Sequence, residues 1–253
     1  MEETVKGHAH PLSVLIDDIS RIATDMGFSV EDGPELETEY YNFDALNVPK
    51  DHPARDMQDT FFVKRDPDLK EGRYLLRSQT SPVQIRYMKK MVEEKILPPY
   101  AIIAPGKVFR NEATDATHAA QFFQVEGLYV AEDATLGALQ GFLGEFFAKL
   151  FGGTSQVRFR SSFFPFVEPG VEVDMQCFKC GGAGCNVCKG TGWIEIMGAG
   201  MVHPKVLMEC GVDPKKYRGF AFGGGIDRIA MLKWGIDDVR LLYSGDLRVV
   251  NQF

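Results

Sequence analysis

Side chains able to bind a charged ligand are concentrated between positions 106 and 130. Two runs there have the composition of β-strands, and side chains alternate between the two faces of a strand. The alternation places Arg110 and Glu112 on one face of the first strand, and Gln124 and Glu126 on one face of the second. A cation, two carboxylates and an amide would then share one surface, which is suited to positioning a charged substrate.

The same alternation occurs on the solvated face of an ordinary hairpin. The loop between the two runs adds Asp115 and His118, and two aromatic residues, Phe122 and Phe123, follow it directly. Aromatic side chains beside polar groups are typical of a concave, partly dry site. They favour a binding site over an open polar face.

A second cluster has the spacing of a metal site. Cys177, Cys180, Cys185 and Cys188 form two C-x2-C pairs in a glycine-rich stretch. Four thiolates can converge tetrahedrally on zinc, and glycines allow the tight turns between them. A glycine-rich turn without metal is the alternative. Four protein ligands would leave no open position, so we expect a structural Zn²⁺ that staples an inserted knuckle over 175–192.

Composition limits the remaining possibilities. The 253 residues, 45% hydrophobic, can bury one large core, so a single domain over 1–253 is expected. The formal net charge of −7 argues against broad nonspecific binding of nucleic acid. No apolar run reaches the ~20 residues that span a bilayer, and no signal-peptide core is present. These features predict a cytoplasmic protein that does not enter a membrane.

Hydrophobic spacing and punctuation by glycine and proline predict the elements that position these residues. Helices are expected over Leu12–Met26 and 133–151, after Ser81, and after Gly225; strands are expected over 28–30, 75–76, 106–130 (as a pair), 161–170, 193–201 and 219–225; and 35–59, which contains His52, is expected to be a long ordered loop. Cys210 is expected to be a buried thiol.

Three stretches together resemble the class II aminoacyl-tRNA synthetases. The residues FRNE at 109–112, a loop with a histidine, Phe122 and QVEG at 124–127 resemble motif 2. The helix and strand over 12–30 resemble motif 1, and the glycine-rich strand that runs into a helix carrying Arg228 resembles motif 3. The wording DATH at 115–118 is similar to the catalytic α subunits of bacterial phenylalanyl-tRNA synthetases. The resemblance extends over 7–253.

The resemblance implies an α+β fold with a central antiparallel sheet flanked by helices and a small Cys-rich insertion. It also implies roles in binding ATP. Arg110 would hold the α-phosphate and Arg228 the γ-phosphate, and arginine suits this because its planar fork binds phosphate oxygens bidentately. Glu112 would face the adenine, Phe122 would stack on it, and His118 would reach toward the phosphates. Arg110, Arg228, Glu112 and His118 are therefore the expected catalytic residues.

A second set would bind the amino acid. The residues that the resemblance assigns to phenylalanine are Gln79, Ser81, Gln124, Glu126, Phe164, Phe166, Val167 and Ala221. Phe164 and Phe166 would form the wall against the ring, although three phenylalanines around a proline are also compatible with ordinary core packing. Ala221 would limit the depth of the pocket at the para carbon. Glu168 corresponds to a Mg²⁺ ligand in a site shared with a partner subunit.

The implied activity is formation of phenylalanyl adenylate from ATP and transfer to tRNA(Phe), with Mg²⁺, in an α2β2 assembly with a β subunit. One alternative is a noncatalytic relative that acts as a binding or regulatory subunit, although such relatives usually lack the motif arginines. Another is a zinc-dependent RNA-binding module, for which Lys179 and Lys189 give little basic surface. Family members begin with a helical hairpin that this sequence lacks, which is compatible with a trimmed core or a naturally short form.

Overall fold

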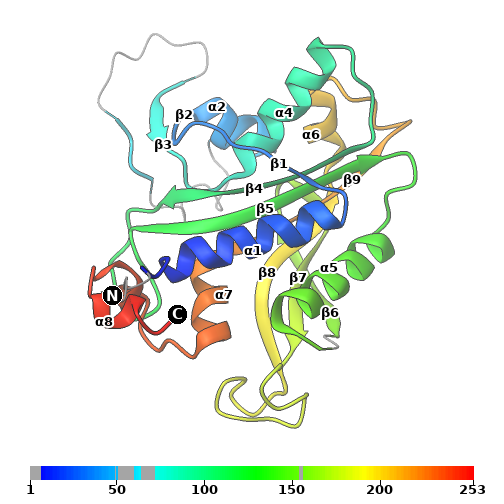
Figure 1. Cartoon of the computed structure of the whole chain (residues 1–253). Coiled ribbons are helices and arrows are strands. Elements are labelled where there is room, and N and C mark those ends of the chain that lie inside the picture. Colours follow the sequence, from blue (N-terminus) through cyan, green and yellow to red (C-terminus); the bar gives the residue numbers. More distant parts are fainter. Residues whose placement is uncertain (1–6, 49, 51–59, 64–71, 154–155) are drawn as a thin grey trace, which may run out of the picture.

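A seven-stranded sheet forms the centre of the molecule (Figure 1). The computed structural model describes residues 7–48, 50, 60–63, 72–153 and 156–253. The strands, in their spatial order, are β1 (Ser29–Val30), β4 (Tyr100–Phe109), β5 (Gln121–Ala131), β9 (Arg218–Gly225), β8 (Trp193–Val202), β7 (Val167–Gln176) and β6 (Val157–Phe164). Only the short β1–β4 pair of this sheet is parallel. The expected α+β fold with a central antiparallel sheet is confirmed.

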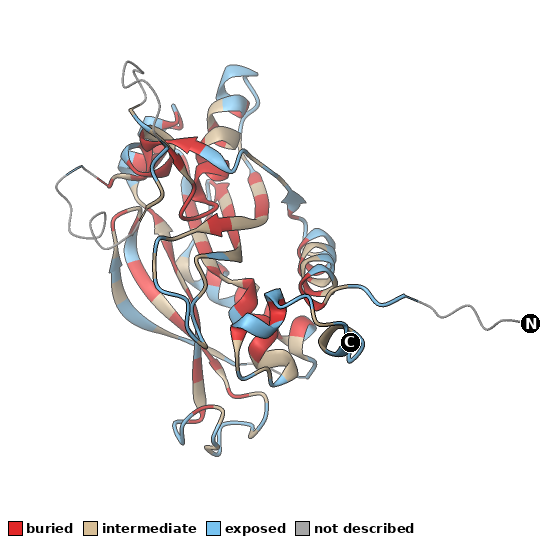
Figure 2. Ribbon diagram, turned by 90° about the vertical axis from the view of Figure 1, so that its left-hand side faces the viewer, coloured by how far each residue is buried: buried red, intermediate tan, exposed pale blue. Residues whose placement is uncertain are grey.

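Helices cover both faces of this sheet. One layer contains α1 (Pro11–Asp25), α5 (Leu136–Phe151) and α7 (Ile226–Trp234), and the other contains α2 (Glu39–Asn42), η1 (Asp44–Leu46), α4 (Ser81–Glu93) and α6 (Pro204–Glu209). A two-stranded sheet of β2 (Leu36–Thr38) and β3 (Tyr74–Leu76) lies beside the second layer, and η2 (Val239–Tyr243) and α8 (Leu247–Val250) follow α7. Each layer packs its own hydrophobic cluster onto the sheet. Buried residues accordingly follow the strands and the inner sides of the helices (Figure 2).

The first helix shows how local sequence fixes an element. Pro11 occupies the first helical position, and the side chain of His10 accepts a hydrogen bond from the backbone N–H of Leu12 at 3.2 Å. Leu15 and Ile19 turn toward the core and are almost completely buried. Gly27 follows with a positive φ, which ends the helix. The predicted helix over 12–26 is confirmed.

Two sequence-based predictions need correction. The stretch 35–59 is not one long loop, because β2, α2 and η1 occupy its first half; His52 lies outside the described residues. Arg110 and Glu112 do not project from a strand face, because β4 ends at Phe109 and both residues begin the loop that follows it. Gln124 and Glu126 do lie within β5, as predicted.

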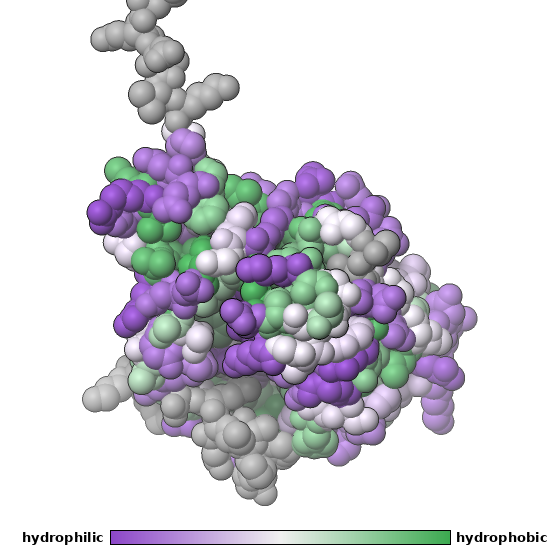
Figure 3. Space-filling model, turned by 90° about the horizontal axis from the view of Figure 1, so that it is seen from below, coloured by the Kyte–Doolittle hydropathy of each residue, from purple (hydrophilic) through white to green (hydrophobic). Residues whose placement is uncertain are grey.

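The cysteine-rich stretch connects β7 to β8 and projects from the lower end of the sheet in Figure 1. Viewed from that side, hydrophilic side chains cover much of the surface, with smaller hydrophobic areas between them (Figure 3). Within the described part of the chain, no helix combines the length and the apolar character needed to cross a membrane.

Candidate active site

A small, largely apolar cavity of about 70 Å³ lies between the sheet and the α4–α6 layer. It is lined by Leu46, Ser81, Gln84, Met88, Gln124, Glu126, Phe164, Phe166, Val167, Gly198, Ala199, Val202, Val206, Ala221, Phe222 and Gly223. Seven of the eight residues predicted to bind an amino acid are in this lining. The structure therefore brings together residues from η1, α4, β5, β6, the β6–β7 turn, β7, β8, α6 and β9.

We call this cavity the amino-acid pocket, after the residues predicted to bind an amino acid. Its one charged residue, Glu126, is only 5% exposed. Its carboxylate accepts hydrogen bonds from the backbone N–H of Thr80 at 3.1 Å, the hydroxyl of Ser81, and the amides of Gln84 and Gln124 at 3.1 and 2.6 Å. Donors on α4 and β5 thus fix a buried carboxylate at the polar end of an apolar cavity. Such a group is suited to receiving a ligand ammonium.

Burial raises the pKa of Glu126 to about 6, and the hydrogen bonds from Ser81 and Thr80 and the charge of Arg110 oppose that rise. The carboxylate is therefore mainly ionised at neutral pH. Gly223 on β9 makes room for it, because a Cβ at this position would lie 2.5 Å from Cγ of Glu126. A side chain in place of Gly223 would displace the carboxylate.

The apolar end of the pocket contains the predicted aromatic wall. The rings of Phe164 and Phe166 lie 5.9 Å apart between centroids and are nearly parallel, with an interplanar angle of 22°. Val167 and Ala221 complete this end of the lining. The cavity is thus bounded by flat apolar surfaces opposite a single buried carboxylate.

Gln79 is the one residue predicted to bind the amino acid that does not line the cavity. Its side-chain amide donates to the backbone oxygen of Asn42 at 3.0 Å, and the residue is buried. Gln84 was not predicted, although it donates directly to Glu126. The available signal was its spacing, because Gln84 follows Ser81 by three positions and so shares its helix face.

A second cavity of about 130 Å³ gathers the residues predicted to bind nucleotide. It is lined by Arg110, Glu112, Thr117, His118, Ala119, Phe122, Gly225, Asp227, Arg228 and Val239. Arg110 lies with its guanidinium carbon 5.0 Å from the centre of the Phe122 ring, and its Nε donates to the backbone oxygen of Ser78 at 3.4 Å. Burial lowers the pKa of Arg110, while the nearby carboxylates of Glu112 and Glu126 oppose that shift.

Arg228 lies on the first turn of α7 and is exposed. Among the described residues, no ion pair or side-chain hydrogen bond engages it, so its guanidinium is available to an anion. His118 is also exposed, and its Nδ1 lies 3.0 Å from the carboxylate of Asp115. Hydrogen bonds from the backbone N–H of Thr117, and from His118, hold the pKa of Asp115 well below its usual range.

Asp227 is a residue of this pocket that was not predicted. It is buried beside Arg228, accepts a hydrogen bond from the backbone N–H of Phe123 at 2.7 Å, and accepts another from the hydroxyl of Tyr243. Burial raises its pKa, and the bonds from Tyr243 and Phe123 oppose the rise. An acidic residue in the first turn of the glycine-preceded helix was the signal that could have indicated it.

The two pockets are contiguous along β5 and β9. Phe122 and Gly225 line the nucleotide pocket, and Gln124 and Gly223, each two residues away on the same strands, line the amino-acid pocket. Two residues of extended strand span about 7 Å. A ligand carboxylate directed out of one pocket could therefore reach a phosphate held in the other.

Glu168 lies elsewhere. It is exposed near the start of β7 and lines a separate cavity with, among others, Pro169, Tyr217 and Arg218. Among the residues that the structure describes, Glu168 belongs to no group of three or more potential metal ligands. One carboxylate does not make a magnesium site, so a metal at Glu168 would need ligands from outside the described residues.

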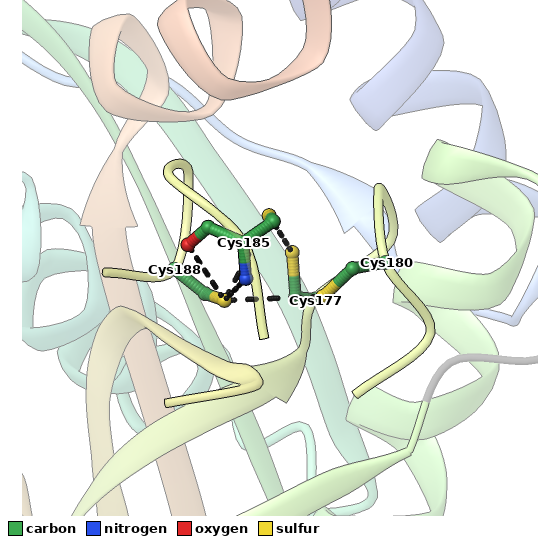
Figure 4. A group of neighbouring side chains, drawn as sticks. All are labelled: Cys177, Cys180, Cys185 and Cys188. Atoms are coloured by element: carbon green, nitrogen blue, oxygen red, sulfur yellow. Dashed lines mark hydrogen bonds between the residues drawn. The ribbon is translucent and has the colours of Figure 1, made fainter. Parts of the chain in front are cut away.

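The four clustered cysteines can hold a metal ion. Their sulfur atoms all lie within 4.8 Å of one another, with separations of 3.7 Å for Cys177–Cys185 and 3.8 Å for Cys180–Cys188 (Figure 4). Four thiolates placed tetrahedrally at about 2.3 Å from zinc would be about 3.8 Å apart. The arrangement therefore fits a tetrahedral thiolate site. Cys177 and Cys188 are also part of the main hydrophobic cluster.

The sheet, the buried carboxylate and the two arginines on one cavity define a class of protein that the comparisons identify. A family model described as the class II core domain (F) of tRNA synthetases matches residues 1–253. Curated relatives named phenylalanine–tRNA ligase α subunit are 56% identical in Caldanaerobacter subterraneus subsp. tengcongensis, 56% in Bacillus pumilus and 54% in Clostridium perfringens. Each match covers 98% of this chain and 69% of the relative. The chain belongs to this family of class II phenylalanine–tRNA ligase α subunits.

Proposed function

We propose that the chain is the catalytic subunit of a phenylalanine–tRNA ligase, which activates L-phenylalanine with ATP and transfers it to tRNA(Phe). The observation that carries the proposal is the continuity of the two pockets along β5 and β9. One pocket offers an apolar slot with a buried carboxylate, and the other offers two arginines. This is the arrangement needed for attack of an amino-acid carboxylate on the α-phosphate of ATP.

The amino-acid pocket would bind phenylalanine by both of its ends. Glu126 would pair with the ammonium group, with Gln124 and Ser81 as neighbouring hydrogen-bond partners, and the ring would lie against Phe164 and Phe166. The protein has little covalent chemistry to perform, so catalysis would come from holding the carboxylate in line with the α-phosphate. An apolar pocket rejects an added hydroxyl by only about a hundredfold. Tyrosine would therefore also be activated slowly.

The nucleotide pocket would supply charge. Arg110 is placed beside Phe122, so the same region can bind the α-phosphate and stack on adenine. Arg228, exposed in the lining of the same cavity, would bind the γ-phosphate. The Arg110 guanidinium is held by Ser78 and Phe122 before the substrate arrives, which is how charge that develops on phosphate oxygens is stabilised most effectively. Glu112 and His118 would contact the base and the phosphates.

The assembly in which the enzyme works follows from the same family. We propose a β subunit as partner, in an α2β2 assembly in the cytoplasm, with tRNA(Phe) bound by the complex. Mg²⁺ would accompany ATP and neutralise charge on the departing pyrophosphate. The exposed Glu168 is the candidate for a Mg²⁺ ligand in a site that the partner would complete.

We also propose that the cysteine knuckle holds a structural zinc. Phe178, next to Cys177, stacks on Phe151 at the end of α5, with ring centroids 5.0 Å apart. A metal at the four sulfurs would thus fix the far end of the β7–β8 hairpin onto the core. Its contribution would be to stability, because all four positions of a tetrahedral ion would be occupied by protein.

The test of the main proposal is amino-acid-dependent exchange of pyrophosphate into ATP, measured for all twenty amino acids with and without the candidate β chain. Exchange should depend on phenylalanine, with slow exchange on tyrosine. Arg110→Ala, purified in the same way, should show no exchange, which controls for a contaminating enzyme.

The outcomes are distinct. Exchange with a different amino acid would refute the assignment of the apolar pocket. No exchange in either condition, from a folded chain, would favour a noncatalytic binding subunit.

A further inference from the structure

The nucleotide pocket has a border formed by η2, a short 3-10 helix that no motif identifies. Val239, its first residue, lines the cavity together with Arg110 and Arg228. Val239 is only 2% exposed and belongs to the main hydrophobic cluster. The segment is therefore part of the pocket, although it lies after the last recognised motif in the chain.

A single backbone hydrogen bond joins η2 to the β4–β5 loop, residues 110–120. This loop carries most of the residues predicted to bind nucleotide. The backbone N–H of Val239 donates to the backbone oxygen of Ala116 at 2.8 Å. Within the described residues, the other backbone hydrogen bonds outside helices and strands that this loop makes are local, from Arg110 to Ala120 and from Asp115 to His118. The bond from Val239 therefore ties the middle of the loop to the rest of the molecule.

The 3-10 helix is itself anchored firmly enough to act as a support. The Tyr243 hydroxyl donates to Asp227, whose second oxygen accepts from the backbone N–H of Phe123 at 2.7 Å. The ring of His10, at the start of α1, contacts the backbone oxygen of Leu242 at 2.8 Å. Asp227 on α7 and His10 at the start of α1 thus hold η2 directly, and β5 fixes Asp227.

We propose that η2 is a positioning element for ATP, in which Val239 holds the β4–β5 loop over the nucleotide pocket and Tyr243 fixes η2 against Asp227. A loop that is already ordered loses less conformational entropy when the triphosphate binds. Neither residue needs to touch the nucleotide. The inference rests on the proposed ATP-dependent function, and it concerns the affinity for ATP rather than for the amino acid.

A proline substitution detaches the loop from η2, because the ring Cδ replaces the amide hydrogen that faces the Ala116 oxygen. Val239 is the first residue of the 3-10 helix, a position where proline is tolerated, and Asp238 before it has the extended conformation (φ −137°, ψ 116°) that a following proline requires. Val239→Pro deletes the N–H that Ala116 accepts. Val239→Ala keeps that N–H and loses side-chain volume, so the difference between the two variants reports the attachment of the loop to η2.

The measurement is pyrophosphate exchange with the complete enzyme, giving KM for ATP and KM for phenylalanine separately. Because the lost hydrogen bond contributes about 1 kcal/mol and the proline ring also displaces the loop, Val239→Pro should raise KM for ATP by at least about fivefold relative to Val239→Ala. Tyr243→Phe should raise it by about threefold to fivefold, since it removes one hydroxyl that bonds a carboxylate. KM for phenylalanine should stay within experimental error. Leu241→Ala, on the exposed side of the same helix, should behave as wild type.

Amide hydrogen exchange gives a readout that does not depend on activity. In the unliganded enzyme, amides of residues 111–119 should exchange faster in Val239→Pro than in Val239→Ala, with the rest of the sheet unchanged. Equal KM values for ATP in these two variants, or parallel rises in both KM values, would refute the proposal. If wild type shows no phenylalanine-dependent pyrophosphate exchange, the proposed function is refuted. Amide hydrogen exchange still decides whether η2 orders the loop.

Discussion

The two pockets are built in different ways. The amino-acid pocket lies between the sheet and a helical layer, and its one charged group, Glu126, is buried and accepts hydrogen bonds from four residues. The nucleotide pocket lies at the end of β5, where Arg228 is exposed and a loop supplies most of the remaining groups. Under the proposed function, substrate selection would fall to the buried pocket and charge stabilisation to the more exposed one.

This difference has consequences for how each pocket can fail. A change among the buried residues alters hydrogen bonding or packing that also supports the fold. A change at an exposed guanidinium removes a ligand contact and leaves the fold intact. The two pockets can therefore be separated by measuring stability and the two KM values on the same variants.

The largest effect is expected for Glu126→Gln. Removing a charge that pairs with a buried ammonium costs about 2–5 kcal/mol, so activation of phenylalanine should fall at least about thirtyfold. Above pH 6 the folded protein should gain from losing a buried charge but lose hydrogen bonding, because the new NH2 faces groups that already donate to the carboxylate. Burial raises the pKa of Glu126 to about 6. The stability that this shift contributes is fully present below the unfolded pKa and lost as pH rises through about 6.

Thermal unfolding at pH 8 and pH 5 tests this directly. Relative to wild type, Glu126→Gln should be more stable at pH 8 than at pH 5. In wild type, KM for phenylalanine should rise as pH falls below 6, because the protonated carboxyl no longer pairs with an ammonium. A difference in unfolding temperature between Glu126→Gln and wild type that is the same at both pH values would contradict the expected cost of the ionised carboxylate.

An effect of about tenfold is expected at the exposed arginine. Arg228→Lys keeps the charge but loses the bidentate fork, so KM for ATP should rise about tenfold with KM for phenylalanine unchanged. The unfolding temperature should not change, because the side chain has no partner in the described structure. Arg218→Lys, an exposed arginine at the start of β9 that lines a different cavity, is the matched control. Equal effects of the two substitutions would remove the γ-phosphate assignment.

Much of this contrast was visible in the sequence. The glycine-rich strand before Arg228 and the alternation at Gln124 and Glu126 are local patterns, and the fold, the family and the grouping of these residues follow from them. The N-terminal helix was predicted within one residue at each end, because its proline and glycine signals are local as well.

The parts that were missed depend on contacts between distant segments. The stretch around β2 and α2 shows no hydrophobic periodicity. Its charged residue Glu37 is buried through an ion pair with Arg86 on α4, at 2.6 Å, and the local sequence does not reveal this partner. Gln84 reads as an ordinary polar helix residue, and only the approach of α4 to β5 makes it a donor to Glu126. The same holds for Val239, which reaches Ala116 across 123 positions (239 − 116). Local patterns do not encode such partners.

A smaller effect is expected where the apolar end of the amino-acid pocket is enlarged. Ala221→Gly removes the methyl group that would face the para carbon, so it should allow activation of para-substituted phenylalanines at a cost of only a few-fold in activity on phenylalanine. Ala101→Gly, in β4 and outside both pockets, controls for the general cost of glycine in a strand, about 0.5–1 kcal/mol. If wild type and Ala221→Gly discriminate equally against the bulkier substrates, Ala221 does not limit the depth of the pocket.

The smallest effect on catalysis is expected at the cysteine knuckle, which is separated from both pockets by the length of the β7–β8 hairpin. Cys177→Ala should abolish zinc binding, measured by metal analysis, and lower the free energy of unfolding by several kcal/mol, because a structural zinc site contributes directly to folding. Cys210→Ala removes another buried sulfur outside the cluster and should cost only about 1–2 kcal/mol, the price of a small cavity. Both KM values should be unchanged in each variant at a temperature where it is folded. If metal-free wild type is as stable as the zinc-loaded chain, the structural role is refuted. If Cys177→Ala selectively raises KM for phenylalanine, the knuckle controls the shape of the amino-acid pocket through β7 and β8.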